Sequence, residues 1–200
     1  KPAPAKAVAP KPEVETMAKP AVEDEPTDLL ERISLFCLRK RTMPSHAHDA
    51  LWIGRYCLLD KHSEGAMGVV CRAIDPQFPE RPVALKIPKA THGPALRRRI
   101  RDEGAMLARV RHTHVLTVYE VGECEDTLFI ATEFVAGPSL RAWQDAQPRP
   151  WRELLALYLQ VGEGLAEIHR KGVVHQDIKP DNVQVRRGDG SLSEIKNFRR

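Results

Sequence analysis

A short stretch near the end of the chain gathers the side chains best suited to chemistry. Between apolar flanks, Asp177, Lys179 and Asn182 supply a carboxylate, a cation and an amide, at offsets of two and five residues from the acid. A carboxylate can accept a proton from an attacking hydroxyl, a lysine can hold a transferring anion, and an amide oxygen can ligate a hard cation. Because Pro180 disfavours helix, the stretch is predicted to be a loop of fixed shape. A polar turn after a helix is the simpler alternative.

Two segments further upstream contain residue types that suit phosphate binding. Gly65 and Gly68 lie between two apolar runs, and glycines there let backbone N–H groups approach a phosphate closely. Glycine-containing hairpin turns are common, so this signal alone is weak. The apolar run 83–87, Val-Ala-Leu-Lys-Ile, carries a single lysine, Lys86. Its plain alternative is a strand-end lysine whose ammonium group reaches water.

Taken together, these segments resemble the protein kinase family. The loop around Asp177 is similar to H-R-D-L-x-x-x-N, the run from Ser63 to Val70 to G-x-G-x-x-G-x-V, and the run 83–87 to V-A-I-K. A helix glutamate, a hinge and a degraded metal motif complete six segments in the family's order, and that ordered set is far more specific than any one segment. The Gly-Ala-Met-Gly run of the loop, together with the Pro/Ala/Lys-rich tail, resembles the bacterial Ser/Thr kinases of eukaryotic type.

The resemblance implies a role for each matching residue. Asp177 would orient and deprotonate the substrate hydroxyl, Lys179 would steady the γ-phosphate, and Asn182 would hold Mg²⁺. Lys86 would hold the α- and β-phosphates and would itself be fixed by Glu103. The expected ATP-binding residues are Ser63, Gly65, Ala66, Gly68, Val70, Ala84, Lys86, Glu103, Thr132, Glu133 and Val135. Of these, Glu133 and Val135 would contribute backbone groups to the adenine.

The sequence departs from the family pattern at three residues. Ser63 replaces the first glycine of the loop, and Gln176 replaces an arginine that commonly pairs with a phosphorylated activation loop. Asn197 stands where the family has the aspartate of D-F-G, which holds Mg²⁺. We expect Asn197 to be a weak second metal ligand, because a hard cation prefers a charged oxygen to a neutral one.

Hydrophobic periodicity predicts the elements that position these residues. We expect an α+β, protein kinase-like fold: a small antiparallel five-stranded lobe with one helix, plus the start of a helical lobe. The predicted strands are 56–61, 69–74, 83–87, 115–121, 127–132, 183–185 and 194–196, and the predicted helices are 28–41, 94–109 and 151–171. In the last helix, one apolar face is expected to contain Leu154, Tyr158, Val161, Leu165 and Ile168.

The chain divides into three predicted segments. Residues 1–27 form a Pro/Ala/Lys-rich tail that is expected to be disordered, since such a composition cannot bury a core. Residues 28–50 form a short helix, expected either to pack on the domain or to be marginally stable, and a linker. Residues 51–200 form the kinase domain, with an N-lobe at 51–132, a hinge at 133–138 and a partial C-lobe at 139–200. We expect the domain to be truncated after Arg200 and the 151–171 helix to expose apolar surface.

Composition narrows the classes of partner. The net charge of +4 falls on the residues after 50, because the first fifty balance eight basic against eight acidic residues. That excess suits an anionic ligand but is too small to predict nucleic-acid binding. Four dispersed cysteines indicate a reducing compartment, expected to be cytoplasmic. No apolar run in this chain is long enough for a membrane span, and the sequence is compatible with an anchor beyond residue 200.

These features predict an ATP- and Mg²⁺-dependent serine/threonine protein kinase with a protein substrate. The alternative is a pseudokinase or truncated remnant that binds nucleotide or partners without turnover, which Asn197 favours. A kinase of small molecules is a third interpretation that the glycine loop and Lys179 disfavour.

Overall fold

The computed structural model describes residues 28–43, 49–65, 68–89, 93–175, 177–186 and 192–195. The side chains of Leu96, Glu103 and residues 192–195 are not part of that description. The predicted tail 1–27 and the residues Ala66, Gln176 and Asn197 also lie outside it. The elements are α1 Leu29–Thr42, β1 Trp52–Ile53, β2 Tyr56–Gly65, β3 Gly68–Ile74, β4 Pro82–Pro88, α2 Pro94–Leu107, β5 Val118–Cys124, β6 Thr127–Glu133, α3 Leu140–Asp145, α4 Trp151–Arg170, η2 Pro180–Asn182, β7 Val183–Val185 and β8 Leu192–Ile195.

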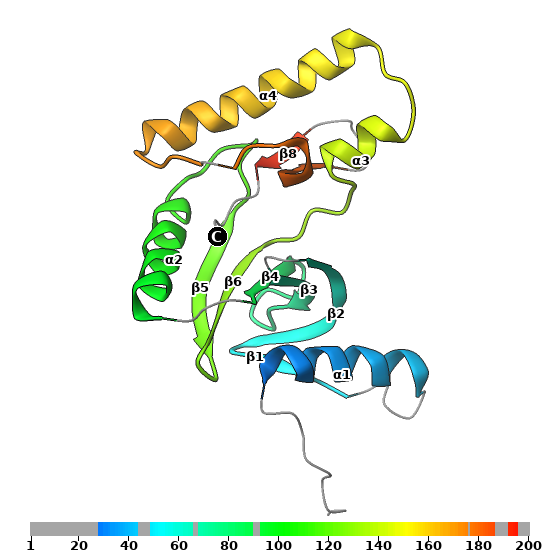
Figure 1. The fold of residues 1–200 in the computed structure, drawn as a ribbon, viewed down its shortest axis with the longest axis vertical. Helices are drawn as coiled ribbons and strands as arrows, with labels where there is room; N and C mark the ends of the chain where they lie inside the picture. The colour runs from blue at the N-terminus through cyan, green and yellow to red at the C-terminus, as the bar shows by residue number, and fades with distance from the viewer. Residues whose placement is uncertain are drawn as a thin grey trace, which may run out of the picture.

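An antiparallel sheet in the order β1-β2-β3-β4-β6-β5 forms the first lobe (Figure 1). It has six strands, so the predicted count of five is wrong. The additional strand β1 pairs Trp52 with Cys57 and Ile53 with Tyr56. A two-residue strand has no period for sequence analysis to detect, although Ile53 is fully buried.

Residues of β4 alternate between the core of this lobe and the opposite face of the sheet. Val83, Leu85 and Ile87 are buried in the core, whereas Ala84 and Lys86 point to the opposite face. The apolar run 83–87 was predicted to be a strand, and that prediction is confirmed.

Helix α1 is an integral part of the first lobe. Asp28 caps it by accepting a hydrogen bond from the backbone N–H of Leu30 at 3.2 Å. Leu29, Ile33 and Phe36 are buried in the same cluster as the residues of β1 to β4. The expected helix and its packing on the domain are both confirmed. Burial of each large side chain stabilises the lobe by roughly 1.5–3 kcal/mol.

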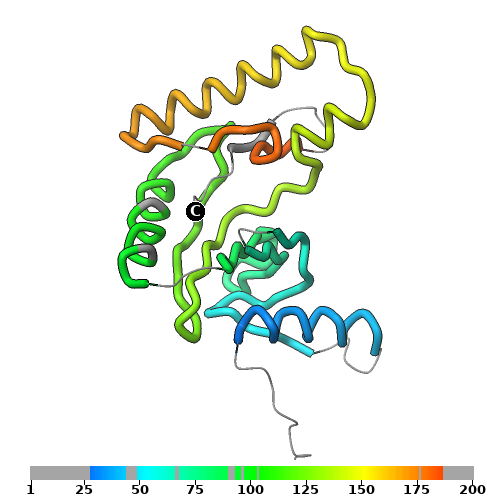
Figure 2. Tube along the Cα trace, in the orientation of Figure 1, coloured from blue at the N-terminus to red at the C-terminus, as the bar shows by residue number. Residues whose placement is uncertain are grey.

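Helix α2 lies along the outer strand β5 (Figure 1). Ile100 is its buried contact and packs with Val118 of β5 and with Leu128 and Ile130 of β6. The chain after α2 reaches towards α4 before it returns as β5 (Figure 2), so Val110 and Val115 pack in the core of the second lobe.

Helix α4 dominates the second lobe, but its buried face differs in part from the predicted one. The buried residues are Leu157, Val161, Gly164 and Ile168. Tyr158, predicted to face the core, is 43% exposed. Gly164 explains the shift, since a Cβ at this position would lie 2.6 Å from the carbonyl oxygen of His114. At Gly164 the backbone of α4 lies so close to the backbone of His114 that a side chain on residue 164 would clash with it.

The outer side of α4 carries large apolar side chains. Trp151, Leu155 and Leu159 are each more than 45% exposed and follow one another at four-residue spacing. The helix does expose apolar surface, but these three residues are not on the predicted apolar face, of which Tyr158 is the exposed member. Within the described ranges, no helix is both long and apolar enough to cross a bilayer.

Candidate functional site

The loop after α4 brings together the three side chains that opened the sequence argument. The amide nitrogen of Asn182 donates to the backbone oxygen of Asp177 at 2.8 Å and to its carboxylate Oδ2 at 2.9 Å. The Nζ of Lys179 lies 3.2 Å from the same Oδ2. The carboxylate is therefore held by a cation and an amide, both from within five residues.

This arrangement settles the protonation state of the carboxylate. The hydrogen bond from Lys179, followed by that from Asn182, holds the pKa of Asp177 below its usual range. The group is ionised at neutral pH and can accept a proton. Because the Asn182 nitrogen is used by Asp177, its oxygen is the atom left to ligate a cation.

The local sequence explains the rigidity of this loop. Pro180 opens η2, where its missing N–H costs nothing, and the backbone N–H of Asn182 donates to the backbone oxygen of Lys179 at 2.9 Å. Downstream, Val183 and Val185 are buried in the second core and anchor the loop. Upstream, the buried His175 accepts the Asp177 N–H at its carbonyl, 3.0 Å away. Sequence analysis did not select His175 as a site residue, although it opens the motif.

The glycine hairpin joins β2 to β3. Gly65 pairs with Gly68, and Ser63 pairs with Val70. A Cβ on Gly68 would lie 2.2 Å from the carbonyl oxygen of Ile87, and its φ of 146° is a conformation that side chains rarely adopt. Gly65 has open space around it. Gly68 is thus required by the close approach of β4, whereas Gly65 keeps a narrow backbone available for a ligand.

Glu64 links the hairpin to its neighbours through two ion pairs. Its carboxylate lies 2.7 Å from Nζ of Lys89, just after β4, and 2.9 Å from Nζ of Lys61. The hydrogen bonds from Lys89 and then Lys61 lower the pKa of Glu64 to about 2. Sequence analysis missed this group. The Lys61–Glu64 spacing was a weak signal for it, while the Lys89 contact depends on strand register.

The sheet carries several predicted nucleotide-binding residues on one face. Val70 is opposite Lys86 in the β3–β4 ladder, and Ala84 is opposite Thr132 in the β4–β6 ladder. Because Ala84 and Lys86 are two residues apart, all four side chains share that face. Glu103 lies in α2, but its side chain is outside the description, so its pairing with Lys86 stays a prediction. The same holds for the metal role of Asn197.

The linker between the lobes is held at both ends. The Phe134 N–H donates to the carbonyl of Pro82, and the Val185 N–H donates to the carbonyl of Pro138, both at 2.9 Å. Buried Thr132 donates its hydroxyl to the carbonyl of Glu133 at 3.2 Å. The Glu133 carboxylate accepts from Arg186 at 2.7 Å, which ties the linker to the second lobe.

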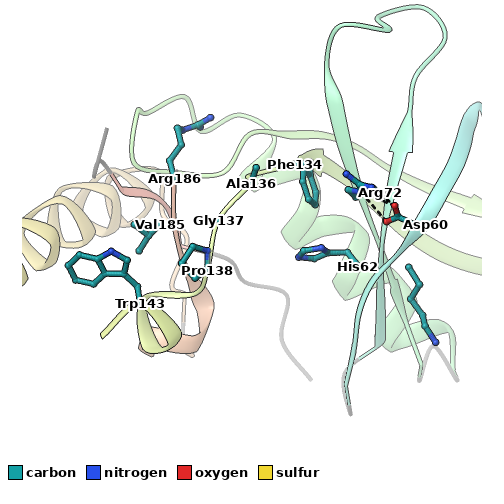
Figure 3. A pocket seen from close by; sticks show the side chains of 11 residues that line it. Asp60, His62, Arg72, Phe134, Ala136, Gly137, Pro138, Trp143, Val185 and Arg186 are labelled. Carbon is teal, nitrogen blue, oxygen red and sulfur yellow. Dashed lines mark hydrogen bonds and ion pairs between the residues drawn. The ribbon is translucent and has the colours of Figure 1, made fainter. Parts of the chain in front are cut away.

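A cavity of about 990 Å³ lies beside this linker, between the β2–β3 strands and the start of the second lobe (Figure 3). Its described lining residues are Asp60, Lys61, His62, Arg72, Phe134, Ala136, Gly137, Pro138, Trp143, Val185 and Arg186. None of the predicted ATP-binding or catalytic residues that the structure describes lines it. The cavity borders the predicted adenine-binding backbone but does not coincide with the predicted phosphate site.

The described residues fit a magnesium ion held largely by a nucleotide. They include no group of three or more His, Cys, Asp or Glu side chains arranged to bind a metal. Mg²⁺ commonly binds through one or two protein oxygens together with substrate phosphates. The amide oxygen of Asn182 is a hard donor of this kind.

Residues 57–196 match the family model described as "Protein kinase domain". A probable serine/threonine-protein kinase, pknA2, of Bifidobacterium longum is 36% identical over 138 residues, which are 66% of this chain and 18% of the relative. The serine/threonine-protein kinase PknL of Mycobacterium bovis is 32% identical over 151 residues, 74% of this chain and 38% of the relative. The chain therefore spans less than half the length of these curated relatives.

Solved structures show the same similarity. A double mutant of the Mycobacterium tuberculosis PknI kinase domain superposes with a TM-score of 0.67 at 29% identity, covering 72% of this chain and 60% of that domain. The chain thus has the fold of that kinase domain over the part that it covers.

Proposed function

We propose that this chain, which belongs to the protein kinase family, transfers the γ-phosphate of ATP to serine or threonine hydroxyls of a protein. The observation that carries the proposal is the assembled loop of Asp177, Lys179 and Asn182. Its ionised carboxylate, neighbouring cation and free amide oxygen are the groups that phosphoryl transfer needs, in one rigid segment.

The chemistry follows from the positions of these groups. The hydroxyl oxygen of the substrate attacks the γ-phosphorus, and the bond from that phosphorus to the β-phosphate oxygen breaks. Asp177 receives the hydroxyl proton, and Lys179 offsets negative charge on the transferring group. When bound, Mg²⁺ supplies positive charge to the phosphate oxygens, with Asn182, and more weakly Asn197, as its protein ligands.

The first lobe would bind the nucleotide. Lys86 would contact the α- and β-phosphates, and Val70 and Ala84, on the same sheet face, would cover the adenine. Backbone groups of Glu133 and Val135 would hydrogen-bond the adenine edge. Thr132 is buried next to them and would limit the depth of the pocket.

Phosphate transfer from labelled ATP to a generic protein substrate tests this assignment. Asp177→Asn removes the proton acceptor with little change in shape, and we expect transfer to fall by about 10²–10⁴-fold. Asp145→Asn, an exposed acid at the end of α3, is the matched control and should transfer as the parent chain does. Equal transfer by Asp177→Asn and the control would reject the role of Asp177.

A second candidate function is nucleotide binding without turnover. Asn197 at the metal position supports it, because a neutral oxygen is a weaker ligand for a hard cation than a carboxylate. The thermal midpoint measured with ATP, with and without Mg²⁺, separates the two candidates. A shift that needs no metal, in a chain that transfers no phosphate, favours the binding module.

We also propose a reducing, cytoplasmic setting. Its support is that Cys37, Cys57, Cys71 and Cys124 are all free thiols in the structure. Non-reducing mass spectrometry of the chain isolated with thiols blocked tests this, and a disulfide among the four cysteines would contradict it.

A further inference from the structure

The linker between the lobes is anchored at both ends and leaves a short segment between its anchors. At the first end, the Phe134 N–H donates to the carbonyl of Pro82 in β4. At the second end, the Val185 N–H in β7 donates to the carbonyl of Pro138. Residues 135–137, Val-Ala-Gly, are therefore the place where a change of backbone angles would rotate one lobe against the other.

A second junction between the lobes limits how they can move. The α2–β5 connection packs Val110 and Val115 into the core of the second lobe. At Gly164 of α4, an added Cβ would lie only 2.6 Å from the carbonyl oxygen of His114 in the same connection. Because this junction is close-packed, the remaining freedom between the lobes lies at the linker.

One ion pair spans the linker directly. Nη2 of Arg186 lies 2.7 Å from Oε1 of Glu133, the distance of a charge-assisted hydrogen bond. Glu133 ends β6 and is paired with Val83 in the sheet of the first lobe. Arg186 directly follows β7, whose valines are buried in the core of the second lobe. The pair thus joins the rigid parts of the two lobes and bypasses residues 135–137.

The cavity beside the linker has walls from both lobes. Asp60 and Arg72 belong to β2 and β3, whereas Trp143 and Arg186 belong to the second lobe (Figure 3). A rotation at the linker would therefore change the width of this cavity. Arg186 contributes to the wall and also forms the ion pair, so the contact and the cavity are coupled.

The exposure of this pair suits a reversible contact. The side chain of Arg186 is 44% exposed and that of Glu133 is 24% exposed. Exposed pairs contribute little to the stability of a fold, and salt screens them. Breaking this pair therefore leaves both cores intact and changes only how often the lobes separate at the linker.

We propose that the Glu133–Arg186 ion pair is a latch that sets the angle between the lobes and thereby the width of the cavity beside the linker. Arg186 is a positioning residue, because it holds Glu133, whose backbone is proposed to bind adenine, in place against the second lobe. That consequence for ATP rests on the proposed function, whereas the latch itself is independent of catalysis.

Charge reversal tests the latch without any need for activity. Arg186→Glu and Glu133→Arg each place like charges across the linker, and the double variant restores an opposite-charge pair. Exchange of the Val185 amide reports on the junction, because its acceptor, Pro138, belongs to the linker. We expect this amide to exchange about two- to fivefold faster in each single variant and close to the parent rate in the double variant. Parent-like exchange in the single variants, or a double variant that does not recover, would overturn the proposal.

Salt and a matched control separate the latch from a general effect of charge. In about 1 M NaCl the difference between the parent chain and the single variants should largely disappear, because the pair is screened. Arg98→Glu reverses an exposed arginine whose partner, Asp102, lies in the same helix, and it should leave exchange of the Val185 amide unchanged. An equal acceleration in Arg98→Glu would assign the effect to net charge, and a difference that persists in salt would assign it to packing. Either result would overturn the latch.

The dissociation constant of ATP, measured by calorimetry, tests the positioning role. We expect binding about two- to fivefold weaker in each single variant and recovery in the double variant. Unchanged binding in variants whose exchange is accelerated would overturn the positioning role of Arg186. A parent chain that binds no ATP would contradict the proposed function, and the exchange result alone would then decide the latch.

Discussion

The two lobes of this chain differ in how completely they bury their apolar surface. In the first lobe, α1 covers the sheet, and Leu29, Ile33 and Phe36 join one continuous core with residues of β1 to β4. In the second lobe, α4 buries one side and leaves Trp151, Leu155 and Leu159 exposed on another. In the first lobe the named apolar side chains of the helix are buried, whereas in the second lobe part of the apolar surface of the helix is exposed.

The difference matters because each lobe carries one half of the proposed site. The proposed nucleotide-binding face belongs to the first lobe, and Asp177 belongs to the second. The loop around Asp177 is nevertheless held by hydrogen bonds among residues 175–182, which do not involve the outer side of α4. The arrangement of Asp177, Lys179 and Asn182 is therefore set locally.

The contrast is sharpest at matched apolar residues in the two helices. Ile33→Ala in α1 removes a fully buried side chain and should cost about 2–5 kcal/mol of unfolding free energy. Leu159→Ala in α4 removes a side chain that is 60% exposed and should cost less than about 0.5 kcal/mol. Urea unfolding of both variants measures the difference. A loss of unfolding free energy for Ile33→Ala as small as that for Leu159→Ala would show that α1 is not part of the core.

Two glycines in α4 test how closely the second lobe is packed on its buried side. Gly164→Ala places a Cβ 2.6 Å from the carbonyl oxygen of His114 and should destabilise the chain by about 1–3 kcal/mol. Gly162→Ala meets nothing within 4 Å and should stabilise the helix by about 0.5–1 kcal/mol. Thermal unfolding of the pair, measured in one buffer, should therefore shift in opposite directions. A stabilising Gly164→Ala would mean that α4 and the His114 segment are less tightly packed than described.

Local periodicity predicted most strands and helices, but it could not choose among several apolar stripes. The run 83–87 is apolar apart from Lys86, so β4 was predictable from the sequence alone, and Val83, Leu85 and Ile87 are its buried residues. Helix α4 is apolar on more than one side, and the buried side is decided by the close approach at Gly164, a tertiary fact. The assignment of Tyr158 to the core was wrong for that reason.

In the candidate site, contacts between residues close in sequence were predictable, whereas contacts set by strand pairing were not. Asp177, Lys179 and Asn182 lie within six residues, so their meeting was predictable from spacing and from the resemblance together. Lys86 and Thr132 share a face only because of strand register, which the sequence does not display. The pairing of Glu64 with Lys89 spans 25 residues and was missed for the same reason.

The smallest expected effect concerns Glu64, an exposed group in the covered lobe. The pKa of Glu64 in the folded chain is about 2, below the ordinary value of 4.5, because Lys89 and Lys61 stabilise the carboxylate. A lowered folded pKa contributes stability that is present above pH 4.5 and lost as the pH falls towards 2. The thermal midpoint of Glu64→Gln should therefore lie slightly below that of the parent chain at pH 6 and approach it near pH 2. Raising the salt concentration at pH 6 should shrink the gap, since solvent screens exposed pairs. A gap that persists unchanged at pH 2 would assign the effect of Glu64 to packing instead of charge.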